Sequence, residues 1–537
     1  MVVEITGLKL SLEEGEDKLK EKVASLFAVP LGKVRTLKII KKSLDARRCH
    51  GKPCFVYVLE VEMELDVPPA MARKERGVLI IREKEVARPS REALPHRGKP
   101  SAKVVVVGSG PAGLFAAFFL VRLGVPVMLL ERGKPVQERI KDVRLFWEEG
   151  ILNRESNVLF GEGGAGTFSD GKLTSRVKDE RAFLVKEVFV NLGAPPEILY
   201  EAKPHIGTDV LSGVVANFRK QLEAWGCEIR FGARVSDFVI RDGRIKELIV
   251  NEQEEIEAPW VILATGQNAE DTYGILAQKG VAMVPKAFAL GLRVEHPQEI
   301  INKGRYGKWW RHPKLPPAEY FLTAKVGNGR SLYTFCMCPG GSIIGCSADP
   351  GRVVVNGMSL SKRDGPLANC ALVVNVHPED FMKNGNALLG LDFRRIWEEK
   401  AFQLGGGGFY APAQRLTDFL REKISATLPT SSFLPGVRSA PLKEVLPPFV
   451  FFALKEGIPV FGKKMPGFIT AEALLVGVET RTSSPLRLLR GEDGQSVNVR
   501  GLFPCGEGAG YAGGIISSAV DGLKAAQRLL LAMDGHR

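Results

Sequence analysis

The alternation of hydrophobic and polar positions is most informative between residues 104 and 131. Val104–Val107 is a run of four β-branched residues, which is typical of a short strand buried on both faces in a parallel sheet. Helical spacing of apolar residues follows from about Pro111, and a second apolar run, Val127–Leu130, ends at Glu131. The pattern therefore predicts a strand, a turn, a helix and a second strand that ends in a carboxylate.

Three glycines fill the predicted turn at the spacing G-x-G-x-x-G. Gly108 permits the tight turn, Gly110 lets the backbone approach a diphosphate, and Gly113 lets the helix pack closely on the strand. The helix N-terminus offers N–H groups and partial positive charge to phosphates. Glu131 follows Gly108 by 23 residues, close to the roughly 20 residues of the dinucleotide fingerprint. We expect Glu131 to accept both hydroxyls of an adenosine ribose and to repel a 2′-phosphate, which disfavours NADP at this site.

The remaining pattern divides the chain into several parts. Residues 1–87 show a strand, a helix and two strands, with a basic segment between the last two, and predict a small ferredoxin-like α/β domain. Residues 88–102 are rich in proline and charge and predict a linker. We expect the dinucleotide-binding domain over 103–274 and 499–537, interrupted by an α+β substrate domain over 275–498.

Two further glycine-rich segments and one strand end are candidates for cofactor contact. The stretch Phe160–Lys172, FGEGGAGTFSDGK, holds five glycines and suits a loop where backbone approaches a ligand, with a surface turn as the alternative. A buried strand within 260–266 ends in Ala-Thr-Gly, and the last strand ends at Gly506 and Glu507 before a helix predicted from about Gly513. We expect these three segments to border the cofactor.

Five side chains are candidates for chemistry with a substrate. Cys336 and Cys338 lie two apart on a predicted strand, so their thiols should share one face, as a redox pair or as small packed side chains. His205 suits proton donation near neutral pH, although a structural hydrogen bond explains it as well. Lys172 could place positive charge beside phosphates or a reduced flavin, or be solvated. Arg481 could bind an anionic substrate or form a salt bridge.

Composition narrows the class of protein. The chain has 537 residues, 45% hydrophobic and 25% charged, which is ordinary for a globular protein of two or three domains. A net charge of +13 fits either an anionic partner such as RNA or a solvated basic surface. We expect no membrane span, because no uninterrupted apolar run reaches about 20 residues. Eight cysteines without zinc-site spacing and the lack of a signal-peptide pattern predict a cytoplasmic protein with reduced thiols and no metal.

Several segments together resemble one known family: GSGPAGLFAA, LFGEGGAGTFSDGKLTSR, EAKPHIGTDVL, FCMCPGG, GVETRTSSP and GEGAGYAGGIISSAVDG. The chain resembles the uncharacterised FAD-dependent dehydrogenases that carry a fused N-terminal α/β domain, with Cys505 in place of the usual alanine. The resemblance implies an α/β fold in which a Rossmann-type FAD-binding domain, similar to glutathione reductase, carries the inserted α+β domain and the small N-terminal ferredoxin-like domain.

The resemblance and the motifs together give a set of expected FAD contacts. Glu507 is expected to hold a ribityl hydroxyl, and Val235 to touch the adenine. The full set is Gly108, Gly110, Pro111, Ala112, Gly113, Glu131, Arg132, Gly163, Gly164, Gly166, Val235, Ala264, Thr265, Gly266, Gly506, Glu507, Gly513, Gly514 and Ile515.

The sequence favours an FAD-dependent oxidoreductase that transfers a hydride between a small-molecule substrate and flavin N5, with NADH or NADPH as a candidate electron donor. Two alternatives remain open. One is an RNA-associated flavoprotein anchored by its basic N-terminal domain, and the other is a flavin-bearing redox sensor without turnover.

Overall fold

The computed structural model describes residues 2–47, 51–64, 73–75, 78–82, 103–175, 177–327, 329–382 and 385–534. The chain forms two compact units. The smaller comprises residues 1–97 with the segments 195–204 and 302–318, and the larger comprises the rest. The prediction had placed those two short segments in the dinucleotide-binding and substrate domains. The predicted linker, 88–102, lies outside the described residues.

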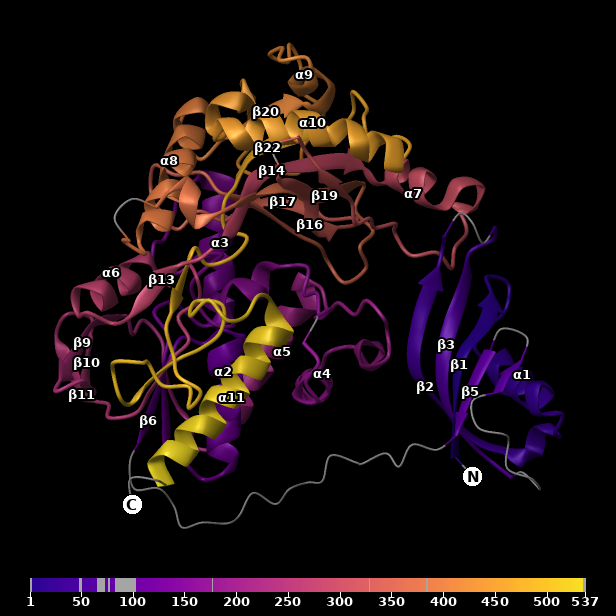
Figure 1. The fold of residues 1–537 in the computed structure, drawn as a ribbon, viewed down its shortest axis with the longest axis horizontal. Helices are drawn as coiled ribbons and strands as arrows, with labels where there is room; N and C mark the ends of the chain where they lie inside the picture. Colours follow the sequence, from indigo (N-terminus) through magenta and orange to yellow (C-terminus); the bar gives the residue numbers. More distant parts are fainter. Residues whose placement is uncertain are drawn as a thin grey trace. The chain divides into compact units, whose positions relative to one another are not determined.

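The smaller unit is built on one antiparallel sheet in the order β2-β3-β1-β5-β4 (Figure 1). The alternation of β1 directs Val3 and Ile5 into a core that also receives Leu19 and Val23. A register shift between Thr6 and Leu8 then brings Leu10 into the same core. The predicted strand, helix and two strands are therefore confirmed. Residues 2–82, where described, contain the single α-helix α1, whereas a full ferredoxin-like unit has two. The elements are β1 (Val2–Ser11), α1 (Lys18–Phe27), η1 (Leu31–Lys33), β2 (Val34–Asp45), β3 (Cys54–Met63), β4 (Arg73–Glu75) and β5 (Val78–Arg82).

A five-stranded parallel sheet forms the base of the larger unit. Its order is β24-β12-β6-β7-β8. The strand β24, which precedes the last helix of the chain, therefore pairs with β12, and the other four strands come from the first half of the chain. The four valines of β6 are at most 5% exposed, as expected for a central strand. The strands are β6 (Val104–Val107), β7 (Val127–Leu130), β8 (Glu228–Arg230), β12 (Val261–Leu263) and β24 (Leu502–Pro504).

Helices α2 and α11 run side by side against this sheet (Figure 1). Their contact is close because Gly522 of α11 has no side chain: a Cβ there would lie 2.0 Å from the carbonyl oxygen of Ala112. The helices of this region are α2 (Pro111–Arg122), α3 (Val136–Glu149), η3 (Gly164–Phe168), α4 (Arg181–Asn191), α5 (Thr208–Ala224), α6 (Glu270–Gln278) and α11 (Ile515–Asp534). The short helix η4 (Pro196–Leu199) belongs to the smaller unit.

The predicted meander is confirmed as β9 (Val235–Arg241), β10 (Arg244–Val250) and β11 (Glu254–Glu257). Asp242 and Gly243 both have positive φ, 52° and 64°, as a two-residue hairpin turn requires.

Residues 288–479 contain a seven-stranded sheet in the order β15-β16-β19-β14-β22-β20-β21, and α10 packs on it (Figure 1). Its long central pair, β14 with β19, is antiparallel over ten residues. The elements here are β13 (Met283–Pro285), β14 (Phe288–Pro297), β15 (Thr323–Lys325), β16 (Ser331–Cys338), β17 (Ser342–Gly345), β18 (Val355–Met358), β19 (Leu367–Val376), η6 (Pro378–Asp380), α8 (Leu389–Leu404), β20 (Ala411–Arg415), α9 (Leu416–Leu420), β21 (Val437–Ser439), η7 (Leu442–Val445), α10 (Pro448–Lys464), β22 (Leu474–Glu479) and β23 (Leu486–Leu488). Helix α7 (Gln298–Tyr306) leads from this unit into the segment 302–318 of the smaller unit, which also holds η5 (Gly307–Trp309).

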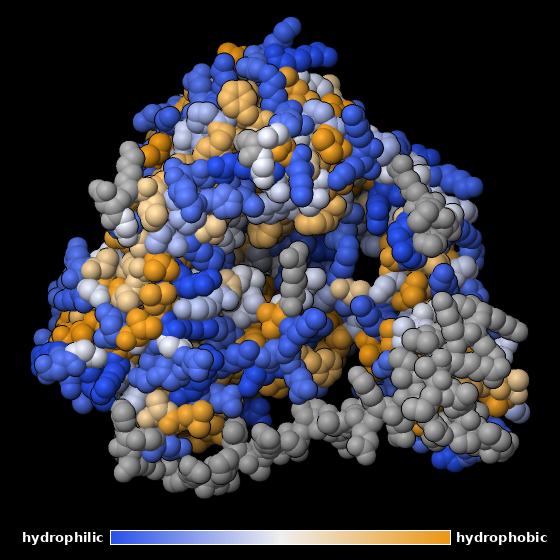
Figure 2. Space-filling model, in the orientation of Figure 1, coloured by the Kyte–Doolittle hydropathy of each residue, from blue (hydrophilic) through white to orange (hydrophobic). Residues whose placement is uncertain are grey.

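The visible surface mixes hydrophobic with hydrophilic side chains rather than gathering them in one band (Figure 2). Exposed large apolar residues such as Phe321, Phe452 and Leu531 come from separate elements, which is normal for a protein surface. Among the described helices, none combines the length and the apolar character that crossing a bilayer requires.

Candidate functional site

A cavity of about 570 Å³ opens at the carboxyl ends of the parallel strands. Its wall includes Val107 of β6, Leu130 of β7, Ala264 directly after β12 and Gly506 after β24. Ligands of open parallel sheets bind at this edge, where strand order reverses. The volume is within the range of about 300–1,000 Å³ for small-molecule and cofactor sites.

The first glycine turn shapes one end of the cavity. Gly108 has φ 102°, and a Cβ on it would lie 2.4 Å from the carbonyl oxygen of Ala264. A Cβ on Gly113 would lie 1.8 Å from the carbonyl oxygen of Gly108. A Cβ on Gly110 would come no nearer than 3.9 Å to another residue, so its missing side chain leaves space in the cavity. No side chain caps the first turn of α2, and its N–H groups are therefore available to an anion.

The second glycine cluster packs directly against the first. The Gly163 N–H donates to the carbonyl oxygen of Ser109 at 3.0 Å. A Cβ on Gly164 would lie 3.1 Å from the Cα of Gly110. Gly164 and Gly166 line the cavity with Ser169, Asp170 and Lys172, whereas Gly163 packs behind the wall against Thr167 and Val215. The loop is thus part of the cavity and not a surface turn.

Glu131 lines the cavity, but its carboxylate is already engaged by the protein. It accepts hydrogen bonds from the N–H and the hydroxyl of Ser109 at 2.9 and 2.7 Å, from the Gly133 N–H at 2.9 Å and from the Gly161 N–H at 3.0 Å. A carboxylate has about four acceptor positions. A ribose hydroxyl would have to displace one of these donors, so the ribose contact of Glu131 stays a prediction.

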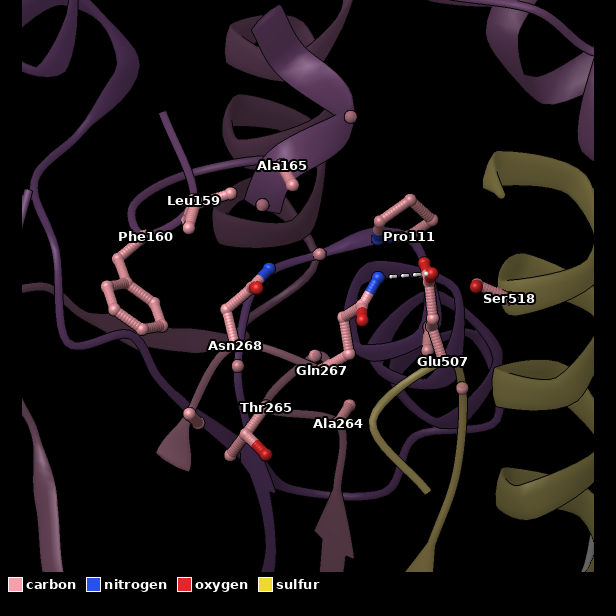
Figure 3. Close-up of a pocket in the computed structure, with 18 of the residues that line it drawn as sticks. Pro111, Leu159, Phe160, Ala165, Ala264, Thr265, Gln267, Asn268, Glu507 and Ser518 are labelled. Carbon is pink, nitrogen blue, oxygen red and sulfur yellow. Dashed lines mark hydrogen bonds between the residues drawn. The ribbon is translucent and has the colours of Figure 1, made fainter. Parts of the chain in front are cut away.

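Glu507 and Gln267 line the cavity, and Glu507 lies beside Pro111 at the start of α2 (Figure 3). The Gln267 side-chain amide donates to Glu507 Oε1 at 2.8 Å and to the Arg481 carbonyl oxygen at 2.9 Å. Burial raises the pKa of Glu507 to about 7, although the backbone N–H of Gly514 and the charges of Lys286 and Arg394 oppose the shift. The carboxyl group therefore exchanges its proton near neutral pH.

We expect Glu507 to make the protein without ligand less stable as the pH rises. Below about pH 4.5 both folded and unfolded states hold this proton; between there and pH 7 the unfolded state releases it first. One such group lowers the free energy of unfolding by roughly 3 kcal/mol across that interval. Urea unfolding near pH 5 and pH 8 should show a smaller loss for Glu507→Gln than for the unsubstituted protein. Exposed Glu492→Gln is the control, and equal losses for all three proteins would contradict the assignment.

Two buried ion pairs stand at one wall of the cavity. Arg293 Nε donates to Glu479 Oε2 at 2.7 Å. Arg481 Nη2 donates to Glu398 Oε2 at 2.8 Å. Glu479 and Arg481 line the cavity, and the guanidinium of Arg481 also donates to Asn268 Oδ1 at 3.2 Å. The structure thus gives Arg481 the salt bridge that the sequence left as an alternative.

The four candidate reactive side chains separate into two groups. Lys172 and Cys336 line the cavity, and Lys172 donates a hydrogen bond to the Met337 carbonyl oxygen. Cys338 is 0% exposed and does not line it. His205 is not brought into the cavity either: its Nε2 lies 3.0 Å from the Ser361 carbonyl oxygen, and burial lowers its pKa. The structural alternative for His205 therefore holds.

Of the expected FAD contacts, all except Gly113 and Gly163 line the cavity. Both of these lie behind the wall, where a side chain would clash; that they touch the cofactor stays a prediction. The sequence analysis missed further lining residues, among them Leu159, Gln267, Asn268, Asn356, Glu479, Thr482, Ser483 and Ser518. Gln267 and Asn268 directly follow the Ala-Thr-Gly strand end, which is a signal that could have found them.

The residues fit a cofactor with a diphosphate. Glycine backbone and the uncapped end of α2 suit the phosphates, and the half of the cavity near Gln267, Glu507 and Ile515 offers hydrogen bonds and apolar surface. Within the described ranges, no three His, Cys, Asp or Glu side chains are grouped so that they could hold a metal ion.

Fold and cavity thus define a mixed α/β protein with a dinucleotide-type cofactor site. Family models agree. Residues 101–141 match an FAD binding domain, residues 287–482 match the "FAD-dependent protein, C-terminal domain-like" model, and residues 2–62 match a domain of unknown function.

Relatives extend the match to the whole chain. An uncharacterized protein of Clostridium beijerinckii is 43% identical over 538 residues, covering 99% of both chains. The chain belongs to the same family as this protein, and two of its segments match models of FAD-dependent proteins. The benzene 1,2-dioxygenase system ferredoxin–NAD(+) reductase subunit of Pseudomonas putida is 26% identical over 239 residues, which is 43% of this chain and 52% of the reductase. Halogenase PltM in complex with phloroglucinol and FAD is 11% identical, covers 81% of this chain and 70% of its own, and has a TM-score of 0.36.

Proposed function

We propose that the protein is an FAD-dependent oxidoreductase that transfers a hydride between a small-molecule substrate and flavin N5. The observation that supports this best is the continuous cavity, which joins the glycine turn at the end of β6 to the ion-paired wall formed by Glu479 and Arg481. Bound FAD would supply the redox chemistry, while the protein positions it and tunes its potential. NADH or NADPH is the proposed electron donor.

The proposed domain arrangement follows from that cavity. Residues 103–274 and 499–537 would form an FAD-binding domain of glutathione-reductase-like topology, and residues 275–498 would form the substrate domain. The N-terminus of α2 would face the diphosphate, and Val235 the adenine. Glu507 would accept a ribityl hydroxyl when ionised. The start of α11 at Ile515 would face the pyrimidine edge of the flavin, where partial positive charge favours reduction.

Anaerobic rapid mixing of the FAD-loaded protein with NADH and with NADPH tests this function. We expect the flavin absorbance to bleach with at least one donor, and the bleached protein to recover its colour when an organic electron acceptor is added. If neither nicotinamide nor any of a panel of reduced metabolites bleaches the flavin, the oxidoreductase proposal fails. That result would favour the alternative of a flavin-bearing redox sensor without turnover.

A second candidate function, RNA association, is favoured by one feature of the smaller unit. Trp309 and Trp310 lie in a strongly basic segment, and cationic side chains stack on both rings. Lys52 Nζ lies 4.8 Å from the ring centre of Trp309, and Arg311 lies 4.5 Å from that of Trp310. Aromatic rings among cations are the usual platform for single-stranded nucleic acids.

We expect single-stranded RNA to bind the full-length protein at low salt, with affinity that falls steeply as salt rises. Fluorescence anisotropy of a labelled oligonucleotide measures this. Replacing both Trp309 and Trp310 with alanine should weaken binding about tenfold or more, since stacking contributes about 1–3 kcal/mol per base. Replacing Trp225, an exposed tryptophan of the larger unit, is the control. Absence of binding at low salt would end this candidate.

A further inference from the structure

Cys336 lies at an irregularity in strand β16. The pairing of β16 with β19 shifts register between Phe335 and Cys338, and Cys336 has φ 46°. Left-handed backbone is unfavourable for a residue with a side chain, and such strain gathers at functional sites. The regular alternation that predicted both thiols on one face is therefore wrong in detail: Cys336 faces the cavity, and Cys338 lies behind it.

The irregularity nevertheless brings the two thiols together. The Cys338 thiol donates a hydrogen bond to the carbonyl oxygen of Cys336, 3.4 Å away, and the interaction between the two thiols shifts the pKa of both. Both cysteines are free thiols. A thiol that lines a cavity, with a second, buried thiol two residues along the same strand, suits thiol–disulfide exchange, with one attacking and one resolving thiol.

Positive charge surrounds this pair. Lys172 donates to the carbonyl oxygen of Met337, the residue between the two cysteines, and Arg293 donates to the carbonyl oxygen of Cys336 at 3.2 Å. Two carboxylates lie near these cations: Asp170, 3.5 Å from the Lys172 ammonium, and Glu479, which is ion-paired with Arg293. The hydrogen bond from Cys338 holds the pKa of Cys336 well below its usual range; burial opposes this shift, and Lys172 and Arg293 assist it. The pKa of Cys338 is raised well above the usual value by the same hydrogen bond and by burial.

We infer that Cys336 and Cys338 form a thiol–disulfide exchange site for a small organic disulfide, with Cys336 as the attacking thiolate, Cys338 as the resolving thiol and Lys172 as the charge that positions them. This inference rests on the proposed function, because the FAD cavity and the thiol pair share one wall. It specifies the substrate class that the oxidoreductase would act on.

The exchange balances in two steps. The Cys336 thiolate attacks one sulfur of R–S–S–R, the S–S bond breaks, one RS⁻ leaves, and a mixed disulfide forms on Cys336. Cys338 then loses its proton to the departing RS⁻ and attacks Cys336 Sγ, which releases the second RS⁻ and closes the Cys336–Cys338 disulfide. The pair has lost two electrons, and the substrate has become two thiols once the second RS⁻ takes a proton from water. A hydride donor of the reduced-nicotinamide class, acting through the bound FAD, would return two electrons and protons to the pair.

The test uses the full-length FAD-loaded protein and 2-hydroxyethyl disulfide as the probe, with mass spectrometry of the peptide 331–352 as the readout. We expect the unsubstituted protein to lose two hydrogens from this peptide. Cys338→Ser should instead trap one probe half as a mixed disulfide on Cys336. Cys336→Ser should neither lose two hydrogens from this peptide nor trap a probe half. Cys346→Ser, which removes the third cysteine of the peptide, should behave like the unsubstituted protein.

The role of Lys172 is tested by the rate at which Cys336 is alkylated. Lys172→Met should slow alkylation of Cys336 by iodoacetamide near neutral pH by about tenfold, because less thiolate is present, and Lys172→Arg should restore most of the rate.

The FAD absorbance of each sample reports separately on the proposed function. If the peptide keeps its mass while FAD is bound, the exchange site is wrong and the flavoprotein stands. Thiol exchange in a protein that never binds FAD would leave the site standing and remove the proposed function. Equal trapping on Cys336→Ser and Cys338→Ser would overturn the assigned roles.

Discussion

Gly110→Val is expected to abolish retention of FAD while leaving the fold intact. The backbone at Gly110 is extended, with φ −72° and ψ −179°, a conformation that valine adopts readily and that the following proline favours. A Cβ there meets nothing in the protein closer than 3.9 Å but projects into the space where a diphosphate would approach the end of α2. Loss of two charge-assisted hydrogen bonds, at about 1.5–3 kcal/mol each, weakens binding by at least about 100-fold.

Equilibrium titration with FAD and urea unfolding of the protein without ligand measure the two halves of this result. Gly213→Val in α5 is the matched control, since a Cβ at Gly213 also has nothing within 4 Å and Gly213 lies outside the cavity lining. It should bind FAD normally. Normal FAD affinity of Gly110→Val, or its failure to fold, would contradict the placement of the diphosphate.

Glu398→Ala is expected to destabilise the protein by about 3–5 kcal/mol, the usual result of leaving a buried charge without its partner. Glu398 is 0% exposed on α8 and accepts hydrogen bonds from Thr480 Oγ1 at 2.6 Å and from Arg481 Nε and Nη2 at 3.1 and 2.8 Å. Without it, the buried cations Arg481 and Arg394 keep only Glu270, 3.7 Å from each. Urea unfolding of the protein without ligand measures the loss.

The neighbouring Glu399→Ala supplies the control, because the Glu399 side chain is 48% exposed and lies 3.9 Å from Arg352. It should change stability by less than about 1 kcal/mol. Although burial opposes the shift, Arg481 lowers the pKa of Glu398 to about 2. Its stabilising effect is therefore present above about pH 4.5 and is lost as the pH falls through 2. Equal losses for both variants would mean that the ion pair does not stabilise the fold.

The sequence predicts the cofactor end of the site well because that end is built from local structure. A strand, three glycines and a helix lie within one short segment, and the turn they form depends on few distant contacts. Gly108 and Gly113 carry the steric roles that the spacing predicted. The final helix begins at Ile515 and not at Gly513, because Gly514 has φ 86° and cannot be a regular helical residue.

The substrate end could not be predicted because its residues converge through long-range pairing. Glu479 reaches the cavity because β22 pairs with β14, and its partner Arg293 comes from that strand. The exposure of Cys336 depends on a register shift against β19, whereas sequence alternation assumes a regular strand. The partners of Glu131 show the same limit: Gly161 N–H belongs to a loop thirty residues further on, and no local pattern indicates that it donates to this carboxylate.

The central claim is that the ADP half of FAD is bound at the glycine turn after β6. It is tested most directly by titrating the protein without ligand with FAD and with FMN, which lacks that half, and by competing FAD with ADP. The account predicts one FAD per chain, binding of FMN at least about 100-fold weaker, and displacement of FAD by excess ADP. Equal affinity for FMN and FAD, or no binding of FAD at all, would contradict it.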